Sequence, residues 1–152
     1  MRVLMVCLGN ICRSPMAEGI LRHKAHSSNL FIEVDSAGTA NYHAGEAPDN
    51  RAIQCMKEYG VDISMLRARQ FSKKDFELFD HILVMDRSNL ENVLSLAKSE
   101  QHRNKVRLIL EYSNSSTNQE VPDPWYGDMD DFHKVHSLLS DALDEFLKTP
   151  AR

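Results

Sequence analysis

The sequence predicts a single α/β domain in which a parallel sheet is covered by helices on both faces. Short apolar runs alternate with helical patterns along the chain, and no linker, repeat or low-complexity tract interrupts them. Alternating strands and helices form right-handed βαβ units, which build parallel sheets. A chain of 152 residues with 42% hydrophobic and 26% charged residues suits one domain, here 1–152.

The first two elements are a strand over 3–6 and a helix over 14–27, joined by a turn that contains Gly and Asn. The strand is wholly apolar, which is typical of a strand buried on both faces. Ser14 and Pro15 are a favoured N-cap and a favoured first helical residue. Apolar side chains then recur at helical spacing, at Met16, Ile20, Leu21 and Ala25.

Three further strands are predicted, over 31–34, 81–85 and 106–110. A helix through Ile53 and Met56 ends at Gly60, another helix follows Asp86, and the polar stretch 113–120 is expected to be a loop. The last helix has one apolar stripe, formed by Phe132, Val135, Leu138, Leu139, Ala142, Leu143, Phe146 and Leu147.

The charge and the cysteines exclude several classes of function. With 18 basic and 22 acidic residues the net charge is −4, so the domain as a whole repels nucleic acid. The one basic cluster, formed by Arg67, Arg69, Lys73 and Lys74, is interpreted as a solvated face. Three cysteines form no secreted disulfide pattern, and no histidine pair combines with them at zinc-site spacing, so no metal is expected.

The N-terminal apolar stretch is too short for a signal peptide, and no apolar run approaches the roughly 20 residues that a membrane-spanning helix needs. A cytoplasmic protein without membrane insertion is therefore expected.

The segment from Cys7 to Pro15 carries the chemistry. It lies between a strand and the start of a helix, where unsatisfied N–H groups and the positive end of the helix dipole bind anions. Gly9 permits close approach, and Asn10 tolerates a left-handed backbone. The same N–H groups and Arg13 would stabilise a thiolate at Cys7, and Arg13 could bind two phosphoryl oxygens at once.

This segment resembles the phosphate loop of the low-molecular-weight protein tyrosine phosphatases. The segments 35–39, 68–70, 79–86 and 123–127 resemble landmarks of the same family in the same order, so the similarity covers essentially the whole chain. The resemblance implies a four-stranded parallel sheet of flavodoxin-like type. It also implies a metal-free and cofactor-free hydrolase that acts on proteins containing phosphotyrosine, as a monomer or weak homodimer.

Aryl phosphate hydrolysis needs a proton donor for the leaving oxygen and then a base for water, and one carboxyl group can serve both steps. Asp123 is the candidate, since Pro124 keeps it out of a helix and the resemblance places the catalytic acid at this motif. The resemblance implies that Cys7 is the nucleophile and Arg13 the phosphate clamp. The phosphate-binding and supporting positions it implies are Leu8, Gly9, Asn10, Ile11, Cys12, Ser14 and Ser36.

Further roles follow from the same resemblance. Tyr42, Trp125 and Tyr126 would flank the phosphotyrosine ring, and Cys12 would be a second thiol able to form a reversible disulfide with Cys7. Asn10 and Ser36 would fix the shape of the loop. Met65 follows Ser64 where the family often has a histidine, so this part of the supporting network is expected to differ.

Three alternatives stay open at this point. An arsenate reductase would need a downstream pair of cysteines, whereas only Cys55 follows the loop. A protein-arginine phosphatase would resemble this loop but have Thr at the position of Ile11. A phosphopeptide-binding module would have no use for the acid at Asp123.

Overall fold

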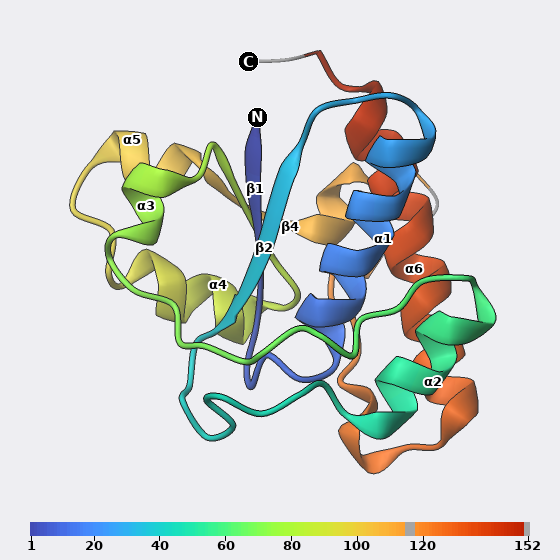
Figure 1. Ribbon diagram of the computed structural model, residues 1–152. Coiled ribbons are helices and arrows are strands. Elements are labelled where there is room, and N and C mark those ends of the chain that lie inside the picture. Colours follow the sequence, from blue (N-terminus) through green and yellow to red (C-terminus); the bar gives the residue numbers. More distant parts are fainter. Residues whose placement is uncertain (115–117, 151–152) are drawn as a thin grey trace.

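Four parallel strands form the centre of the computed structural model, which describes residues 1–114 and 118–150 (Figure 1). The strands are β1 (Arg2–Cys7), β2 (Glu33–Gly38), β3 (His81–Val84) and β4 (Val106–Leu108). Their order in the sheet is β2-β1-β3-β4, and each neighbouring pair is parallel. This order confirms the predicted parallel sheet of flavodoxin-like type.

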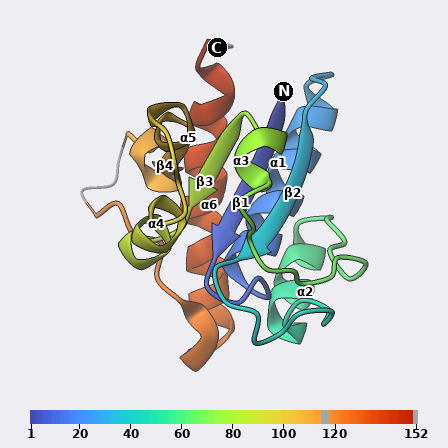
Figure 2. The same ribbon diagram turned by 90° about the vertical axis from the view of Figure 1, so that its left-hand side faces the viewer.

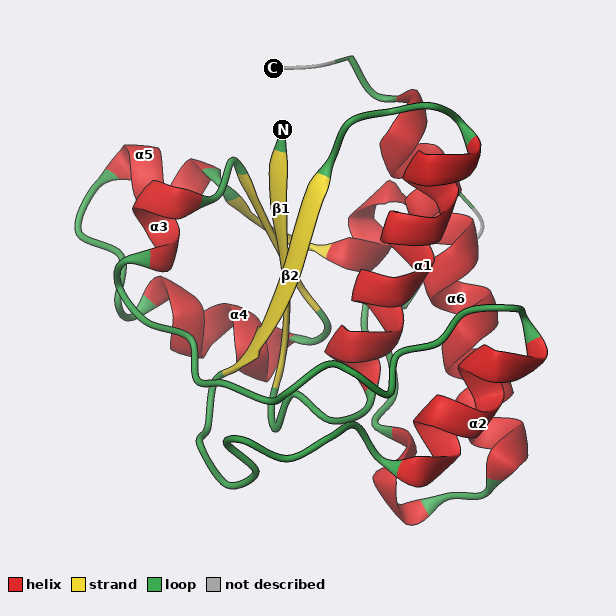
Figure 3. Cartoon of the chain, viewed as in Figure 1, coloured by secondary structure: helices red, strands yellow, loops and turns green. Residues whose placement is uncertain are grey.

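The helices lie in two layers, one on each face of the sheet (Figures 1, 2 and 3). One layer contains α1 (Arg13–Ser27), α2 (Asn50–Glu58) and α6 (Met129–Lys148). The other contains α3 (Asp75–Leu78), α4 (Arg87–Leu94) and α5 (Glu100–Asn104). Two short 3-10 helices, η1 (Ile109–Tyr112) and η2 (Pro124–Tyr126), follow β4 and precede α6.

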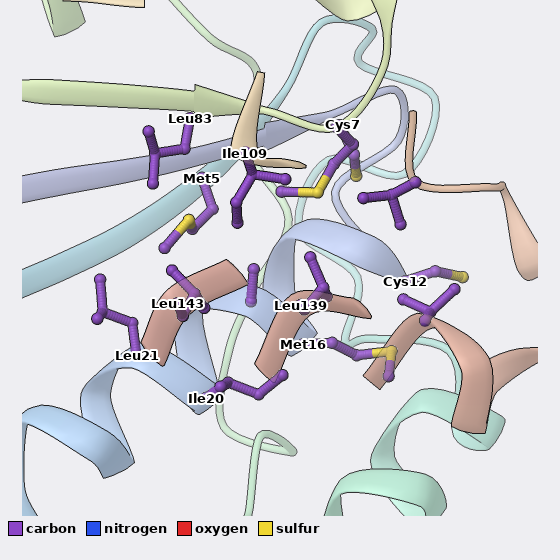
Figure 4. Close-up of a cluster of buried hydrophobic side chains, with 14 of the residues drawn as sticks. Met5, Cys7, Cys12, Met16, Ile20, Leu21, Leu83, Ile109, Leu139 and Leu143 are labelled. Carbon is purple, nitrogen blue, oxygen red and sulfur yellow. The ribbon is translucent and has the colours of Figure 1, made fainter. Parts of the chain in front are cut away.

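Strand β1 contributes to a core on each face of the sheet, because successive side chains of a strand point to opposite sides. Val3 and Met5 join the larger core under α1 and α6, while Leu4 and Val6 join the smaller core under α4. Figure 4 shows Met5, Leu83 and Ile109 packed against the side chains of Leu139 and Leu143. Burial on both faces explains why residues 3–6 of this strand are all apolar.

The second strand begins and ends later than predicted. The prediction of 31–34 followed the apolar residues, but Phe31 is 87% exposed and β2 covers Glu33–Gly38. Its register is fixed by pairing with β1, from Arg2 opposite Glu33 to Cys7 opposite Gly38. Ser36 belongs to the strand through its pairing with Met5, and its hydroxyl can be buried because it is hydrogen-bonded to Asn10 and Glu18.

Two other predicted boundaries were also wrong. The fourth strand ends at Leu108 rather than at 110, because Ile109 and Leu110 turn into η1 and pack in the larger core. Helix α1 begins at Arg13, and Ser14 lies in its first turn rather than at the N-cap. The Ser14 hydroxyl is instead close to Cys7 and Asn10.

In the predicted loop 113–120, residues 113–114 and 118–120 form neither helix nor strand, and residues 115–117 lie outside the described part of the chain. Within residues 1–114 and 118–150, no helix combines the length and the apolar character needed to cross a membrane.

Candidate active site

The segment 7–14, here called the phosphate loop, lies at the carboxyl end of β1, at the lower end of the sheet in Figure 1. Strand β1 lies between β2 and β3 in the sheet, so the loop at its carboxyl end occupies the switch point of the strand order, where open α/β sheets bind ligands. A pocket of about 280 Å³ opens there. Cys7, Arg13 and Asp123 all line it, from segments far apart in the sequence.

The remaining predicted residues divide into two groups. Leu8, Gly9, Ile11 and Cys12 line the pocket floor, and Tyr42, Trp125 and Tyr126 line its mouth. Asn10, Ser14 and Ser36 do not line it but are buried behind the loop, where they are hydrogen-bonded to one another.

Two polar groups of the phosphate loop contact the Cys7 sulfur. Its Sγ lies 3.0 Å from Ser14 Oγ and accepts a hydrogen bond from the Asn10 N–H at 3.3 Å. Cys7 is only 3% exposed, so these groups surround the sulfur away from bulk water. These two contacts fix the position of the sulfur within the phosphate loop.

Asn10 closes the loop through an unusual backbone and a fully bonded side chain. Its φ of 58° is left-handed, a conformation that asparagine tolerates better than most residues. Its Nδ2 donates to Ser14 Oγ at 2.8 Å and to Ser36 Oγ at 2.9 Å. Its Oδ1 accepts from the Arg69 N–H at 3.0 Å. One side chain thus ties the loop to α1, to β2 and to the segment before α3.

Sequence reasoning missed a buried carboxyl group behind this network. Ser36 Oγ donates to Glu18 Oε1 at 2.6 Å, and Arg22 Nη2 donates to Glu18 Oε2 at 2.6 Å. Burial raises the pKa of Glu18, although the hydrogen bonds from Ser36 and Arg22 oppose this. Glu18 and Arg22 have the i, i+4 spacing of an ordinary exposed pair, so the sequence held no signal of burial.

Met65, which follows Ser64 where the family often has a histidine, takes no part in the hydrogen bonds of Asn10. Met65 is 81% exposed, and the polar atoms of Asn10 are hydrogen-bonded to Ser14, Ser36 and Arg69.

The basic cluster formed by Arg67, Arg69, Lys73 and Lys74 is more than a solvated face, because Arg69 donates hydrogen bonds to Asp35 and to both carboxylate oxygens of Asp75. A buried Asp75, 2% exposed, holds this arginine in place.

The phosphate loop is also tied to the end of β2 by its backbone. The N–H groups of Thr39 and Ala40 donate to the carbonyls of Cys7 and Leu8, at 2.9 and 3.0 Å. The two chains approach so closely at Gly38 that a Cβ there would lie 2.7 Å from the Leu8 carbonyl oxygen. Only glycine permits this approach.

Arg13 connects the phosphate loop to two other segments. Its Nη1 donates to Asp86 Oδ2 at 2.7 Å and to the Val121 carbonyl at 3.0 Å, and its side chain is 3% exposed. Its Nη2 lies 3.8 Å from Asp123 Oδ2. Asp86 caps α4 at the carboxyl end of β3. This position in the sequence, directly after a strand, could have predicted that Asp86 reaches the site.

Asp123 lies on the segment 121–127, here called the acid loop. It caps η2, with Oδ1 accepting from the Trp125 N–H at 3.1 Å, and its side chain is 42% exposed. Trp125 stacks at a tilt on His43, with ring centroids 5.7 Å apart. His43 lines the pocket beside Gly9 but was not among the predicted residues, because nothing in its sequence context distinguishes it.

All three cysteines are free thiols. Burial, with a smaller effect of the Asp49 carboxylate, raises the pKa of Cys12, so its thiol is neutral. Cys55 lies on α2 and forms a cluster with Glu58 and His133, whose side chain is 35% exposed. Their possible ligand atoms lie within 4.8 Å of one another, and none of the three lines the pocket.

Comparisons with known proteins agree with this geometry. The family model described as low molecular weight phosphotyrosine protein phosphatase matches residues 2–152. A Schizosaccharomyces pombe protein of that name is 42% identical over 153 residues, covering 99% of this chain and 97% of its own length.

Two solved structures are similar over the whole fold. A protein tyrosine phosphatase from Entamoeba histolytica has a TM-score of 0.92 at 36% identity, covering 97% of this chain and 94% of that one. The Drosophila arginine phosphatase has a TM-score of 0.92 at 33% identity, covering 99% and 100%. The chain belongs to the low molecular weight phosphotyrosine protein phosphatase family.

Proposed function

We propose that this single domain is a protein-tyrosine-phosphatase, which hydrolyses phosphotyrosine and other aryl phosphate monoesters through a phosphocysteine at Cys7. The observation that carries the proposal is the convergence of a thiol, a guanidinium group and a carboxyl group on one pocket. Membership in the family supports the same reaction. We expect proteins that contain phosphotyrosine as substrates, and a monomer or weak homodimer.

In the first step the Cys7 sulfur attacks phosphorus, and the bond from phosphorus to the aryl oxygen breaks. Asp123 donates its proton to the departing oxygen, which leaves as a neutral phenol. Arg13 and the N–H groups of the phosphate loop stabilise the charge on the equatorial oxygens.

In the second step water attacks the phosphocysteine. Asp123, now a carboxylate, takes a proton from the water, and the bond between phosphorus and sulfur breaks to release phosphate. The Cys7 thiolate leaves with the electron pair, and Ser14 Oγ, 3.0 Å from the sulfur, stabilises it with a hydrogen bond.

The residues at the pocket mouth favour an aromatic substrate. Trp125 is 39% exposed and Tyr42 is 73% exposed, so both present ring surface to a ligand that enters above Cys7. The apolar Ile11 on the floor favours an aryl group over a charged guanidino group. Phosphotyrosine combines the ring and the phosphate that these residues would hold.

The first test is hydrolysis of p-nitrophenyl phosphate and a phosphotyrosine peptide in the presence of chelator. Cys7→Ser should lower the rate by about 10⁶-fold, as loss of a nucleophile does elsewhere. Asp123→Ala should lower the rate with the phosphotyrosine peptide by about 10²–10⁴-fold, the usual contribution of a general acid and base, and should lower kcat/KM for p-nitrophenyl phosphate less. Arg103→Gln, on the exposed α5, is a matched control and should keep the wild-type rate.

Phosphoarginine and arsenate should be assayed in parallel, since one structural neighbour is described as an arginine phosphatase. Turnover of either, without turnover of aryl phosphate, would contradict the proposed substrate class. Tight binding of phosphopeptide without any turnover would identify a binding module instead.

A further inference from the structure

Arg51, in the first turn of α2, holds the acid loop by its backbone. Its Nη2 donates to the Trp125 carbonyl at 3.0 Å and its Nη1 donates to the Gly127 carbonyl at 2.9 Å. Its guanidinium also lies over the Trp125 ring, 5.8 Å from the centroid. Figure 1 shows α2 beside the orange segment that precedes α6. One side chain therefore contacts the loop at two points beyond Asp123.

Asp49 fixes the position of this arginine. Its carboxylate accepts from Arg51 Nε and Nη2, both at 3.0 Å, and from the Arg51 N–H at 2.8 Å. Burial alone would raise the pKa of Asp49, but the hydrogen bonds from Arg51 outweigh it and lower the pKa. The bidentate pairing fixes the plane of the guanidinium, which a lysine could not reproduce.

Asp49 is in turn attached to the phosphate loop. Its backbone N–H donates to the Ile11 carbonyl at 2.8 Å. The contacts therefore run from Ile11 through Asp49 and Arg51 to Trp125 and Gly127. This path joins the loop that holds the nucleophile to the loop that holds the acid, and Asp49 and Arg51 lie outside the residues that line the pocket.

We propose that the Asp49–Arg51 pair sets the position of Asp123 relative to Cys7, which makes Arg51 a positioning residue for protonation of the leaving group. The inference rests on the proposed function. Asp123 is partly exposed and is the N-cap of the three-residue 3-10 helix η2, and so short an element by itself defines the position of Asp123 weakly. Proton transfer needs hydrogen-bond reach between the carboxyl group and the leaving oxygen, and a shift of about 1 Å can cost on the order of 10²-fold.

The test is the dependence of kcat/KM on the leaving group, measured with a series of substituted phenyl phosphates. A good leaving group such as p-nitrophenol needs little protonation, whereas phenol needs a proton. Arg51→Gln should therefore lower kcat/KM for phenyl phosphate by roughly ten- to a hundredfold and for p-nitrophenyl phosphate much less. Arg51→Lys retains the positive charge but lacks the planar guanidinium group. It should therefore change the dependence of kcat/KM on the leaving group in the same direction.

Two control experiments distinguish a role of Arg51 in positioning Asp123 from a merely structural role. In Asp123→Ala enzyme, Arg51→Gln should add no further sensitivity to the leaving group, because the acid it positions is absent. Arg103→Gln should leave the dependence unchanged. Circular dichroism verifies folding, and if Arg51→Gln does not fold, the Arg51→Lys variant decides the question.

An equal loss of kcat/KM for every leaving group, or an unchanged dependence, would overturn the inference. Wild-type enzyme that hydrolyses no aryl phosphate would refute the proposed function itself. A wild type whose leaving-group dependence steepens in Asp123→Ala but not in the Arg51 variants would refute the positioning role alone.

Discussion

The phosphate loop and the acid loop face the same pocket, but they are held in different ways. The phosphate loop is buried except at Leu8 and Gly9: Asn10 and Arg13 are each 3% exposed, and side-chain hydrogen bonds attach the loop to α1 and β2. The acid loop is open to solvent, with Tyr126 at 94% exposed. The proposed nucleophile, Cys7, thus lies among buried hydrogen bonds, whereas the proposed acid, Asp123, lies on a loop whose side chains are mostly exposed.

The contacts of the acid loop go mainly to its backbone. Arg13 binds the Val121 carbonyl, and Arg51 binds the carbonyls of Trp125 and Gly127. Val121 N–H also donates to the Met85 carbonyl at 2.9 Å. Because backbone carbonyls are present whatever the side chain, the acid can be positioned while the exposed side chains of the loop vary. The comparison predicts that changes in the two loops will have different kinetic signatures.

Among the residues outside the proposed catalytic set, the largest effect is expected for Asn10→Ala in the phosphate loop. It removes three side-chain hydrogen bonds and leaves buried partners unsatisfied, at a cost of about 1–3 kcal/mol of unfolding free energy for such a group. The misplaced loop should lower kcat/KM by about 10²-fold, equally for good and poor leaving groups.

Asn10→Gly is the matched control for backbone strain. It lacks the same hydrogen bonds but accepts the φ of 58°, so it should be about 1 kcal/mol more stable than Asn10→Ala in denaturant unfolding. A loss of kcat/KM that increased with the pKa of the leaving group would contradict the prediction that Asn10 acts through the position of Cys7.

A smaller effect, dependent on pH, is expected for Glu18→Gln. The native pKa of Glu18 is raised above its ordinary value of 4.5, so the native state holds this proton more tightly than the unfolded chain. The resulting stability is present below pH 4.5 and is lost as the pH rises through the native pKa.

The free energy of unfolding of the wild type, minus that of Glu18→Gln, should therefore be largest near pH 4 and decrease toward neutral pH. Its slope for one proton cannot exceed about 1.4 kcal/mol per pH unit. Denaturant titrations at several pH values measure it, and a pH-independent difference would show that burial does not control this carboxyl group.

The smallest effect is expected for Tyr126→Ala in the acid loop. The side chain is almost fully exposed, so stability should change by no more than about 0.5 kcal/mol, and turnover of p-nitrophenyl phosphate should be unchanged. The KM for a phosphotyrosine peptide should rise, since the ring lies at the pocket mouth. A large fall in kcat for p-nitrophenyl phosphate would mean that side chains of the acid loop also position Asp123.

The sequence by itself determined the parallel α/β fold and the phosphate loop. Both depend on local signals: apolar runs and helical periodicity define the elements, and the spacing from Cys7 to Arg13 is that of a loop encircling an anion. Asp123 was found by resemblance rather than by pattern, because Asp-Pro alone indicates only a turn.

Only the tertiary structure decided which polar residues support the site. Glu18, Arg51 and Arg69 are ordinary charged residues in sequence, and each acquires its role from a partner contributed by another element. The limits of β2 and β4 likewise depend on strand pairing and on which core Ile109 enters. Hydrogen bonds between distant segments require their three-dimensional proximity, and local periodicity holds no information about it.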